Sequence, residues 1–191
     1  GLNQDEVFRQ IVGVSEREFD EAFRQWAPQQ VRAWGFDPES LPGRKEAKRA
    51  AEERPDDPDA LADYAATLMR GRGASPDRAE AIARRSLALQ EDHPRALGVL
   101  AMILVARNDY DEAIDVAAHL EAAKPDSALA PKLLAQCHLA RRDWTEAIAA
   151  LERLKQRQPL DPFSYEQLAK IYLQFGEAAM ERALPNLVEL H

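Results

Sequence analysis

Apolar residues recur at helical spacing through most of the chain. Leu97, Leu100 and Leu104 are one example, and similar sets occur before and after them. Separations of three or four residues place apolar side chains on one face of an α-helix. Prolines such as Pro125 and Pro159 end these segments, and we find no sustained alternation of apolar and polar residues that would predict a strand. The pattern therefore predicts an all-α protein.

The helical segments repeat with a fixed period. Residues 108–114 (NDYDEAI) align with residues 142–148 (RDWTEAI), which lie 34 positions later. Pro125 and Pro159 are separated by the same interval. A period of this length is typical of helical repeat arrays, in which each unit buries its apolar face against its neighbours.

Four helix pairs can be placed, at about residues 58–93, 94–126, 127–160 and 161–191. Each first helix carries a small residue that lets the two helices of a pair approach closely, namely Ala65, Ala101, Ala135 and Ala169. Asp109 and Asp143 are expected to cap second helices. The second helix of the fourth pair departs from the pattern, because Glu181 replaces the small residue and Pro185 interrupts the helix. Its register is therefore not predicted.

Residues 1–55 do not repeat and are predicted to form a helical cap on the array. Ser15 and Glu18 form a capping-box pattern, which indicates the start of a helix. One face of this helix carries three aromatic residues, Phe19, Phe23 and Trp26. Pro28 is expected to break or kink the helix, and a second helix is predicted over residues 43–54.

The composition narrows the functional classes. The 191 residues are 46% apolar and 30% charged, with a net charge of −8. This acidic balance, without a basic block, argues against binding to a nucleic-acid backbone. The longest apolar stretch, residues 97–106, has about half of the roughly 20 residues that a membrane-spanning helix needs, so direct membrane insertion is not expected. The single cysteine, Cys137, cannot form an internal disulfide.

The titratable residues show no pattern of a catalytic, metal or cofactor site. None of the four histidines lies in an H-E-x-x-H motif or has ligands at metal-binding spacing. His138 occupies an aromatic position of the repeat, where packing explains it. Cys137 has no sequence-adjacent base that would activate it, and residues 71–73 lack the features of a phosphate-binding loop. We therefore predict a protein without enzymatic activity, metal or cofactor.

The repeat resembles the tetratricopeptide repeat pattern, W-x2-L-G-x2-Y…A-x3-F…P, which has 34 residues per unit. The second unit matches it best, with Leu97, Leu100, Ala101, Leu104, Ala113, Ala117 and Pro125. The resemblance implies a right-handed α-solenoid whose first helices line a concave groove that binds peptides or partner proteins. The residues of this chain expected to line the groove are Met69, Met102, Val105, Lys132, Gln136, Leu139, Lys170 and Leu173.

The predicted groove is apolar, with a polar distal end. Family members that clamp an acidic peptide C-terminus use a Lys/Asn/Arg set, but here Ala66 and Met102 stand at asparagine positions and Gln136 lies beside Lys132. The groove either recognises an apolar partner segment, to whose shape methionines adapt, or is covered by another part of the chain or by a second copy. The predicted function is a non-catalytic protein-interaction scaffold.

A second resemblance concerns residues 14–26. This segment resembles the region that follows the catalytic domain in bacterial proteins that join a zinc metallopeptidase-like (gluzincin) domain to tetratricopeptide repeats. The zinc-binding helix is not in this chain, so no catalytic residue is carried over. An alternative function is therefore the accessory C-terminal region of such a protein. Gly1-Leu2 looks like a tag remnant, and residues 186–191 lack a polar closing helix, which predicts either a piece of a longer protein or a homodimer through the C-terminal repeat. The sequence does not predict the compartment.

Overall fold

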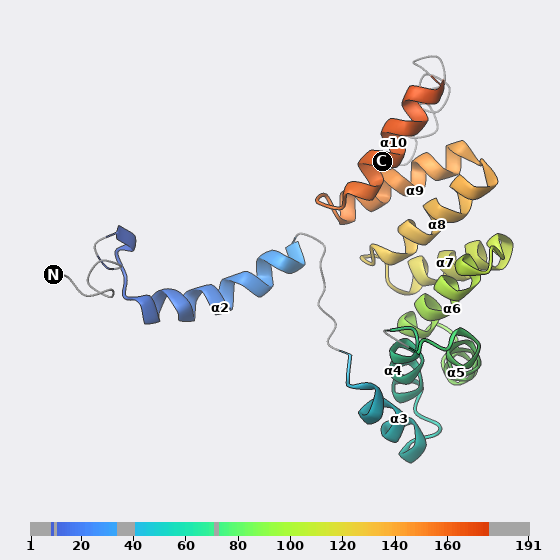
Figure 1. Cartoon of the computed structure of the whole chain (residues 1–191), viewed down its shortest axis with the longest axis horizontal. Helices are drawn as coiled ribbons and strands as arrows, with labels where there is room; N and C mark the ends of the chain where they lie inside the picture. The colour runs from blue at the N-terminus through green and yellow to red at the C-terminus, as the bar shows by residue number, and fades with distance from the viewer. Residues whose placement is uncertain (1–8, 10, 34–40, 71–72, 176–191) are drawn as a thin grey trace. The chain divides into compact units, whose positions relative to one another are not determined.

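The computed structural model describes residues 9, 11–33, 41–70 and 73–175, and every regular element in those residues is an α-helix (Figure 1). This confirms the all-α fold expected from the apolar spacing. No helix in the described part of the chain is both long and apolar enough to cross a membrane. The chain divides into two compact units, residues 1–39 and residues 40–191, which are described separately below. The helical cap predicted from the sequence ends at residue 55, whereas the boundary between the two compact units falls between residues 39 and 40 of the chain.

The long helix of the first unit is α2, Glu16–Ala33. Its predicted capping box is present, because the backbone N and Oγ of Ser15 donate hydrogen bonds to Glu18 Oε2 at 2.8 and 2.6 Å. The Glu18 amide in turn donates to Ser15 Oγ at 3.3 Å. Pro28 lies inside α2 and does not end it. A proline removes its own amide donor and crowds the carbonyl four residues earlier, but the hydrogen-bonded turns on either side can keep the helix together.

The second unit is a row of short helices. Their bounds are α3 Arg44–Glu53, α4 Pro58–Leu68, α5 Pro76–Leu89, α6 Pro94–Ala106, α7 Tyr110–Ala123, α8 Leu129–Arg141, α9 Trp144–Arg157 and α10 Pro162–Phe175. Each of these helices contacts the next one along the chain, and α6 also contacts both α4 and α8. The first helices α4, α6 and α8 therefore lie side by side, and α5, α7 and α9 follow as second helices (Figure 1). The predicted second helix of the fourth pair falls in residues 176–191, outside the described residues.

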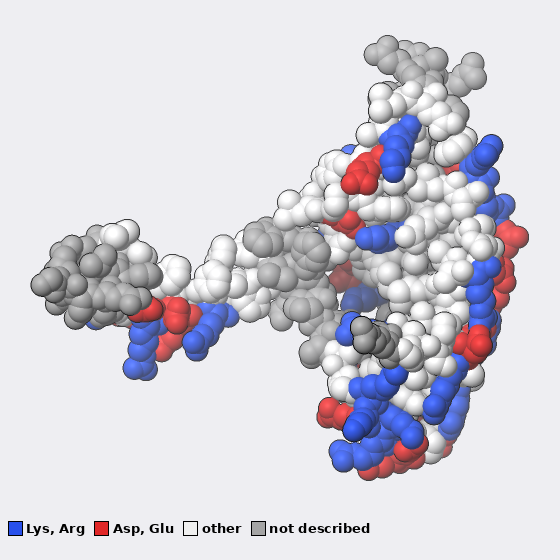
Figure 2. Space-filling view, viewed as in Figure 1, with Lys and Arg blue, Asp and Glu red and all other residues white. Residues whose placement is uncertain are grey.

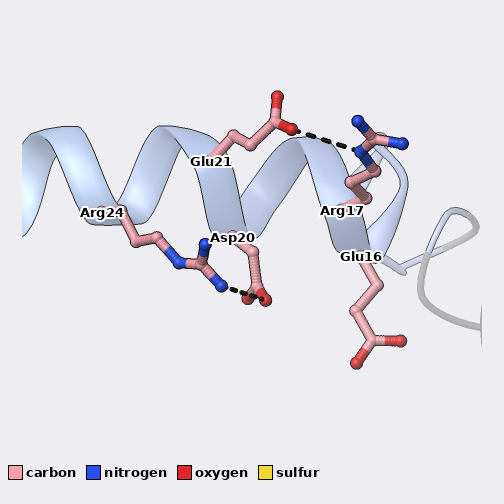
Figure 3. A pocket seen from close by; sticks show the side chains of 5 residues that line it. All are labelled: Glu16, Arg17, Asp20, Glu21 and Arg24. Atoms are coloured by element: carbon pink, nitrogen blue, oxygen red, sulfur yellow. Dashed lines mark hydrogen bonds and ion pairs between the residues drawn. The ribbon is translucent and has the colours of Figure 1, made fainter.

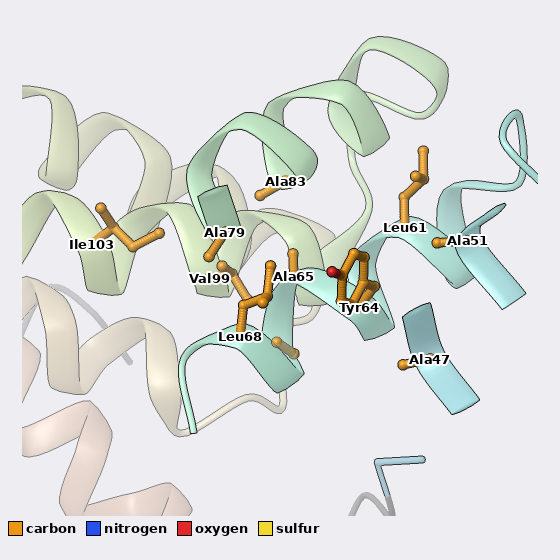
Figure 4. Packing of buried hydrophobic residues seen from close by; sticks show 11 residues of the cluster. Ala47, Ala51, Leu61, Tyr64, Ala65, Leu68, Ala79, Ala83, Val99 and Ile103 are labelled. Carbon is orange, nitrogen blue, oxygen red and sulfur yellow. The ribbon is translucent and has the colours of Figure 1, made fainter. Parts of the chain in front are cut away.

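The core of the second unit is shared between neighbouring helices. At its N-terminal end, Ala47 of α3, Tyr64 of α4, Ala83 of α5 and Ile103 of α6 belong to one cluster (Figure 4). Helix α3 thus packs on α4 and joins the core of the first pair. No pair closes a core by itself, which is the physical basis of a repeat array.

The small residues of the first helices fulfil their expected role in three of the four pairs. Ala65, Ala101 and Ala135 have no exposed surface, so the paired helices meet closely at these positions. Ala169 of α10 is exposed. The segment expected to pair with α10 lies outside the described residues.

The turns between the paired helices repeat in backbone conformation but not in the expected capping. Asn108 and Arg142, which are 34 residues apart, both adopt left-handed φ angles of 63° and 64°. Asp109 and Asp143 occupy the N-cap positions of α7 and α9, but neither side chain accepts a capping hydrogen bond. Asp143 Oδ2 lies instead 3.0 Å from Arg141 Nε. The capping prediction was wrong for these side chains, and for Asp143 an arginine on the preceding helix competes for the carboxylate.

Candidate protein-interaction surface

The residues predicted to line a groove lie on the first helices of successive pairs or directly after them, and we refer to them together as the first-helix surface. Its members are Met69, Met102, Val105, Lys132, Gln136, Leu139, Lys170 and Leu173. None of them is fully buried. Lys170 and Leu173 of α10 are exposed, Leu173 to 87%, and the other six are half-buried.

Four of the five apolar members of this surface pack against the core. Met69 and Met102 pack against the cluster of α3 to α6. Met102 also packs, together with Val105 and Leu139, against a second cluster that extends to α10. The structure therefore brings Met102, Val105 and Leu139 to one core region while leaving part of each side chain accessible. Leu173 joins neither of these clusters of described residues.

Lys132 does not provide a free positive charge on this surface. Its Nζ lies 2.8 Å from Asp161 Oδ2 and 5.5 Å from the centre of the Phe163 ring. Asp161 is buried, with 9% of the residue exposed, and its Oδ1 accepts a hydrogen bond from the Phe163 amide at 3.0 Å. The pair thereby links α8 to the start of α10.

The environment of Asp161 favours its charged form. Burial alone would raise the pKa of this carboxyl, but hydrogen bonds from Lys132 and the Phe163 amide outweigh burial and lower the pKa below its usual value. Asp161 is not among the residues predicted from the sequence to form the surface. A signal was available, because an aspartate directly before Pro162 is a typical helix start.

Ion pairs connect the ends of first helices to the starts of second helices. In Figure 2, blue and red side chains follow one edge of the second unit, and the surface over α6 and α8 is largely white. Arg107, at the end of α6, lies 2.6 Å from Asp77 at the start of α5. Arg141, at the end of α8, pairs in the same way with Asp111 at the start of α7. Both partners shift by 34 residues from one pair to the next, so these contacts form a periodic ion-pair ladder.

Cys137 and His93, two residues of types that can act as nucleophiles or metal ligands, are both held in packed surroundings. Cys137 is buried, and burial raises the pKa of its thiol to about 11, so the thiolate is scarce at neutral pH. His93 Nε2 lies 2.9 Å from Asp59, and its Nδ1 accepts a hydrogen bond from the Ala96 amide at the start of α6. Within the described residues, no group of three or more His, Cys, Asp or Glu side chains is placed to hold a metal ion.

A shallow pocket of about 410 Å³ lies between α3 and α4. Its polar lining includes Glu46, Arg54, Asp59 and Asp63. Asp63 Oδ1 is buried, and an ion pair with Arg95 of α6 compensates the buried carboxylate charge. No unpaired buried group in this pocket points to a ligand.

Comparisons with known proteins agree with a repeat array. Residues 72–154 match the family model described as anaphase-promoting complex, cyclosome, subunit 3. The structure is similar to that of a MamA RS-1 double mutant, with a TM-score of 0.61 and 20% identity over 89% of this chain and 93% of that chain. It is also similar to MamA 41-end from Desulfovibrio magneticus RS-1, with a TM-score of 0.60 and 20% identity over 88% and 91%.

A comparison with curated proteins found no match. The comparisons above give no support to the resemblance of residues 14–26 to metallopeptidase-linked proteins. They agree instead with the overall arrangement of helices described above. The helix pairs of the second unit are therefore similar in fold to those of the MamA structures, and their sequence pattern resembles the tetratricopeptide repeat.

Proposed function

We propose that the second unit is a protein-interaction scaffold that binds an apolar segment of a partner protein on its first-helix surface. The observation that supports this most directly is the partial exposure of four apolar side chains on α4, α6 and α8 or directly after them, namely Met69, Met102, Val105 and Leu139. Apolar surface that remains accessible along several neighbouring elements is typical of an interaction site.

The chemistry of these side chains favours an adaptable site. Met69 and Met102 each have three rotatable bonds and a polarisable sulfur, so they can follow partner surfaces of different shape. Val105 and Leu139 add stiffer apolar contacts beside Met102. This combination suits an amphipathic helix or an extended strand that presents apolar residues.

The polar members of the surface fit a secondary role. Lys132 is already paired with Asp161, so a partner carboxylate would have to compete with that contact. Lys170 is exposed and Gln136 is half-buried, and both can donate hydrogen bonds to a partner's backbone or acidic side chains. We therefore propose that the apolar residues provide most of the binding affinity and that the polar residues orient the partner segment.

The test replaces two apolar residues of the surface. A phage-displayed peptide library is selected against the full chain, and the affinity of an enriched peptide is then measured for each variant. Met102→Glu combined with Leu139→Glu is expected to weaken binding by about tenfold or more, because it places two charges in an apolar contact. Ala118→Glu combined with Gln156→Glu adds the same charges at exposed positions of α7 and α9 and is the matched control.

Two results would contradict the proposal. One is a library that yields no binding peptide. The other is an enriched peptide whose affinity is the same for the Met102/Leu139 variant and the unchanged chain. Circular dichroism of both variants shows whether the helices remain folded.

A further inference from the structure

The ion pairs of α2 show what a solvated pair looks like in this protein. Arg17 Nε lies 3.2 Å from Glu21 Oε1. Arg24 lies 3.8 Å from Asp20 on the same helix (Figure 3). These four side chains are 58 to 89% exposed, so the depression that they line is a charged helix surface. An exposed pair exchanges its partner for water or for an approaching charge at little cost, and it does not restrict what binds beside it.

Two ion pairs between neighbouring repeats are more enclosed. Arg95 of α6 pairs with Asp63 of α4, and their side chains are 27% and 25% exposed. Lys132 of α8 pairs with Asp161, directly before α10, and their side chains are 36% and 11% exposed. Because little water reaches these carboxylates, each cation keeps its partner more firmly than the arginines of α2 do.

Both cations lie on the helix faces that carry the apolar residues of the first-helix surface. Arg95 precedes Met102 by seven residues. Lys132 precedes Leu139 by the same interval. Seven residues are close to two helical turns, so each cation lies about 10 Å along the same face of its helix. A partner segment that contacts Met102 and Leu139 and extends toward the starts of α6 and α8 therefore meets these two ion pairs.

Asp161 is held beside Lys132 by a second contact. Its Oδ1 accepts a hydrogen bond from the Phe163 amide at 3.0 Å, while its Oδ2 lies 2.8 Å from Lys132 Nζ. Because its pKa is lowered, the carboxylate stays charged at neutral pH. A partner carboxylate that approaches Lys132 therefore also meets a fixed negative charge beside the ammonium group. Attraction and repulsion then largely cancel, whereas the loss of water around the partner carboxylate remains a cost.

We propose that Asp161 and Asp63 determine the specificity of the first-helix surface by excluding acidic partner segments. This inference rests on the proposed function and adds the chemistry of the partner, which is an apolar segment without carboxylates where it passes α6 and α8. Each aspartate neutralises a cation that would otherwise attract an acidic side chain of the partner. Lys170 does not replace these cations, because it lies on α10 and is exposed, where a single ion pair contributes little.

The test compares glutamine with glutamate at each position of a peptide that is enriched on the full chain. The two residues are nearly equal in size, so the ratio of their affinities reports the effect of the charge. For the unchanged chain, the glutamine peptide is expected to bind about fivefold or more tightly at the positions that face α6 and α8. Asp161→Asn should lower this ratio by about threefold or more at one peptide position, and Asp63→Asn at another, because each change frees a cation.

Two further variants serve as controls. Lys132→Gln combined with Asp161→Asn also removes the cation and should restore the ratio of the unchanged chain. Asp126→Asn makes the same change of net charge in an exposed turn and should leave the ratio within about twofold. Circular dichroism shows whether each variant is folded. If Asp161→Asn is not, Asp63→Asn applies the same test to Arg95.

Two results would overturn the specificity role. One is an unchanged chain that binds the glutamate peptide as tightly as the glutamine peptide at every position. The other is a ratio that is the same in the unchanged chain and in the folded aspartate variants. Both results leave the proposed function intact if binding still depends on Met102 and Leu139. Binding that does not depend on these two residues contradicts the proposed function, and the specificity role with it.

Discussion

At the scale of single residues, the turn between paired helices depends on the left-handed conformation at two equivalent positions. Asn108 adopts it with little cost, because asparagine tolerates positive φ better than most residues. Arg142 adopts nearly the same φ angle, but its Cβ atom meets the full steric cost of the left-handed conformation. The fold therefore stores a small strain at Arg142, and this strain follows from the repeat geometry.

We predict that Arg142→Gly raises the free energy of unfolding by about 0.5 to 1 kcal/mol, because glycine adopts a φ of 64° without steric cost. Ala140→Gly, two residues earlier and inside α8, is the control and should lower it by about 1 kcal/mol. Urea unfolding of the full chain measures both. A loss of stability in Arg142→Gly would show that the arginine makes a favourable contact that outweighs the strain.

At the scale of elements, the pair of Lys132 and Asp161 joins α8 to the start of α10. It combines a charge-assisted hydrogen bond between repeats with a helix cap on the same carboxylate. Removing the carboxylate charge therefore affects two elements at once. The lowered pKa of Asp161 makes this contribution dependent on pH.

We predict that Asp161→Asn lowers the free energy of unfolding by about 1 to 2 kcal/mol at neutral pH. Because the folded-state pKa is lowered, the contribution of Asp161 is present above its unfolded-state pKa and is lost as the pH falls through the folded-state value. The difference between the two proteins should thus be constant near neutrality and shrink below about pH 4. Urea midpoints between pH 6 and pH 3 measure it.

The control for this experiment is Asp126→Asn, which removes a carboxylate from an exposed turn. Its urea midpoint at neutral pH should stay close to that of the unchanged chain. A gap between Asp161→Asn and the unchanged chain that stays constant down to pH 3 would contradict the role given to the charged carboxylate.

At the scale of the whole molecule, the ion-pair ladder ties successive repeats together along one edge. Its arginines are exposed, so each pair contributes little by itself and salt screens it. Salt has the opposite effect through the net charge of −8, because it screens the repulsion among the acidic residues and so favours the folded state. Only a comparison of variants separates these two effects.

We predict that Arg107→Gln combined with Arg141→Gln lowers the thermal unfolding midpoint at low salt and that the difference from the unchanged chain disappears near 1 M NaCl. Lys45→Gln combined with Lys170→Gln removes the same charge outside the ladder and should produce a smaller decrease at low salt. Equal decreases in the two variants would mean that net charge, rather than the ladder, determines the effect.

Much of the fold could be predicted from local patterns. Apolar spacing and the 34-residue period indicated the helices, and Ala65, Ala101 and Ala135 were correctly identified as sites of close packing. The side-chain caps at Asp109 and Asp143 were wrong, because capping depends on which neighbours compete for the carboxylate. The role of the first-helix surface stays a prediction, because a binding surface depends on its partner as well as on this chain.

The sequence by itself determined the helices, their order and the repeat, because these follow from contacts between residues near in the chain. The tertiary structure decided which charges are paired and which apolar side chains stay accessible. Lys132 loses its free charge to Asp161, 29 residues away, and Leu173 stays exposed while Met102 is half covered. Charge pairing and exposure depend on residues that come into contact only after the helices pack, and no local sequence pattern specifies these contacts.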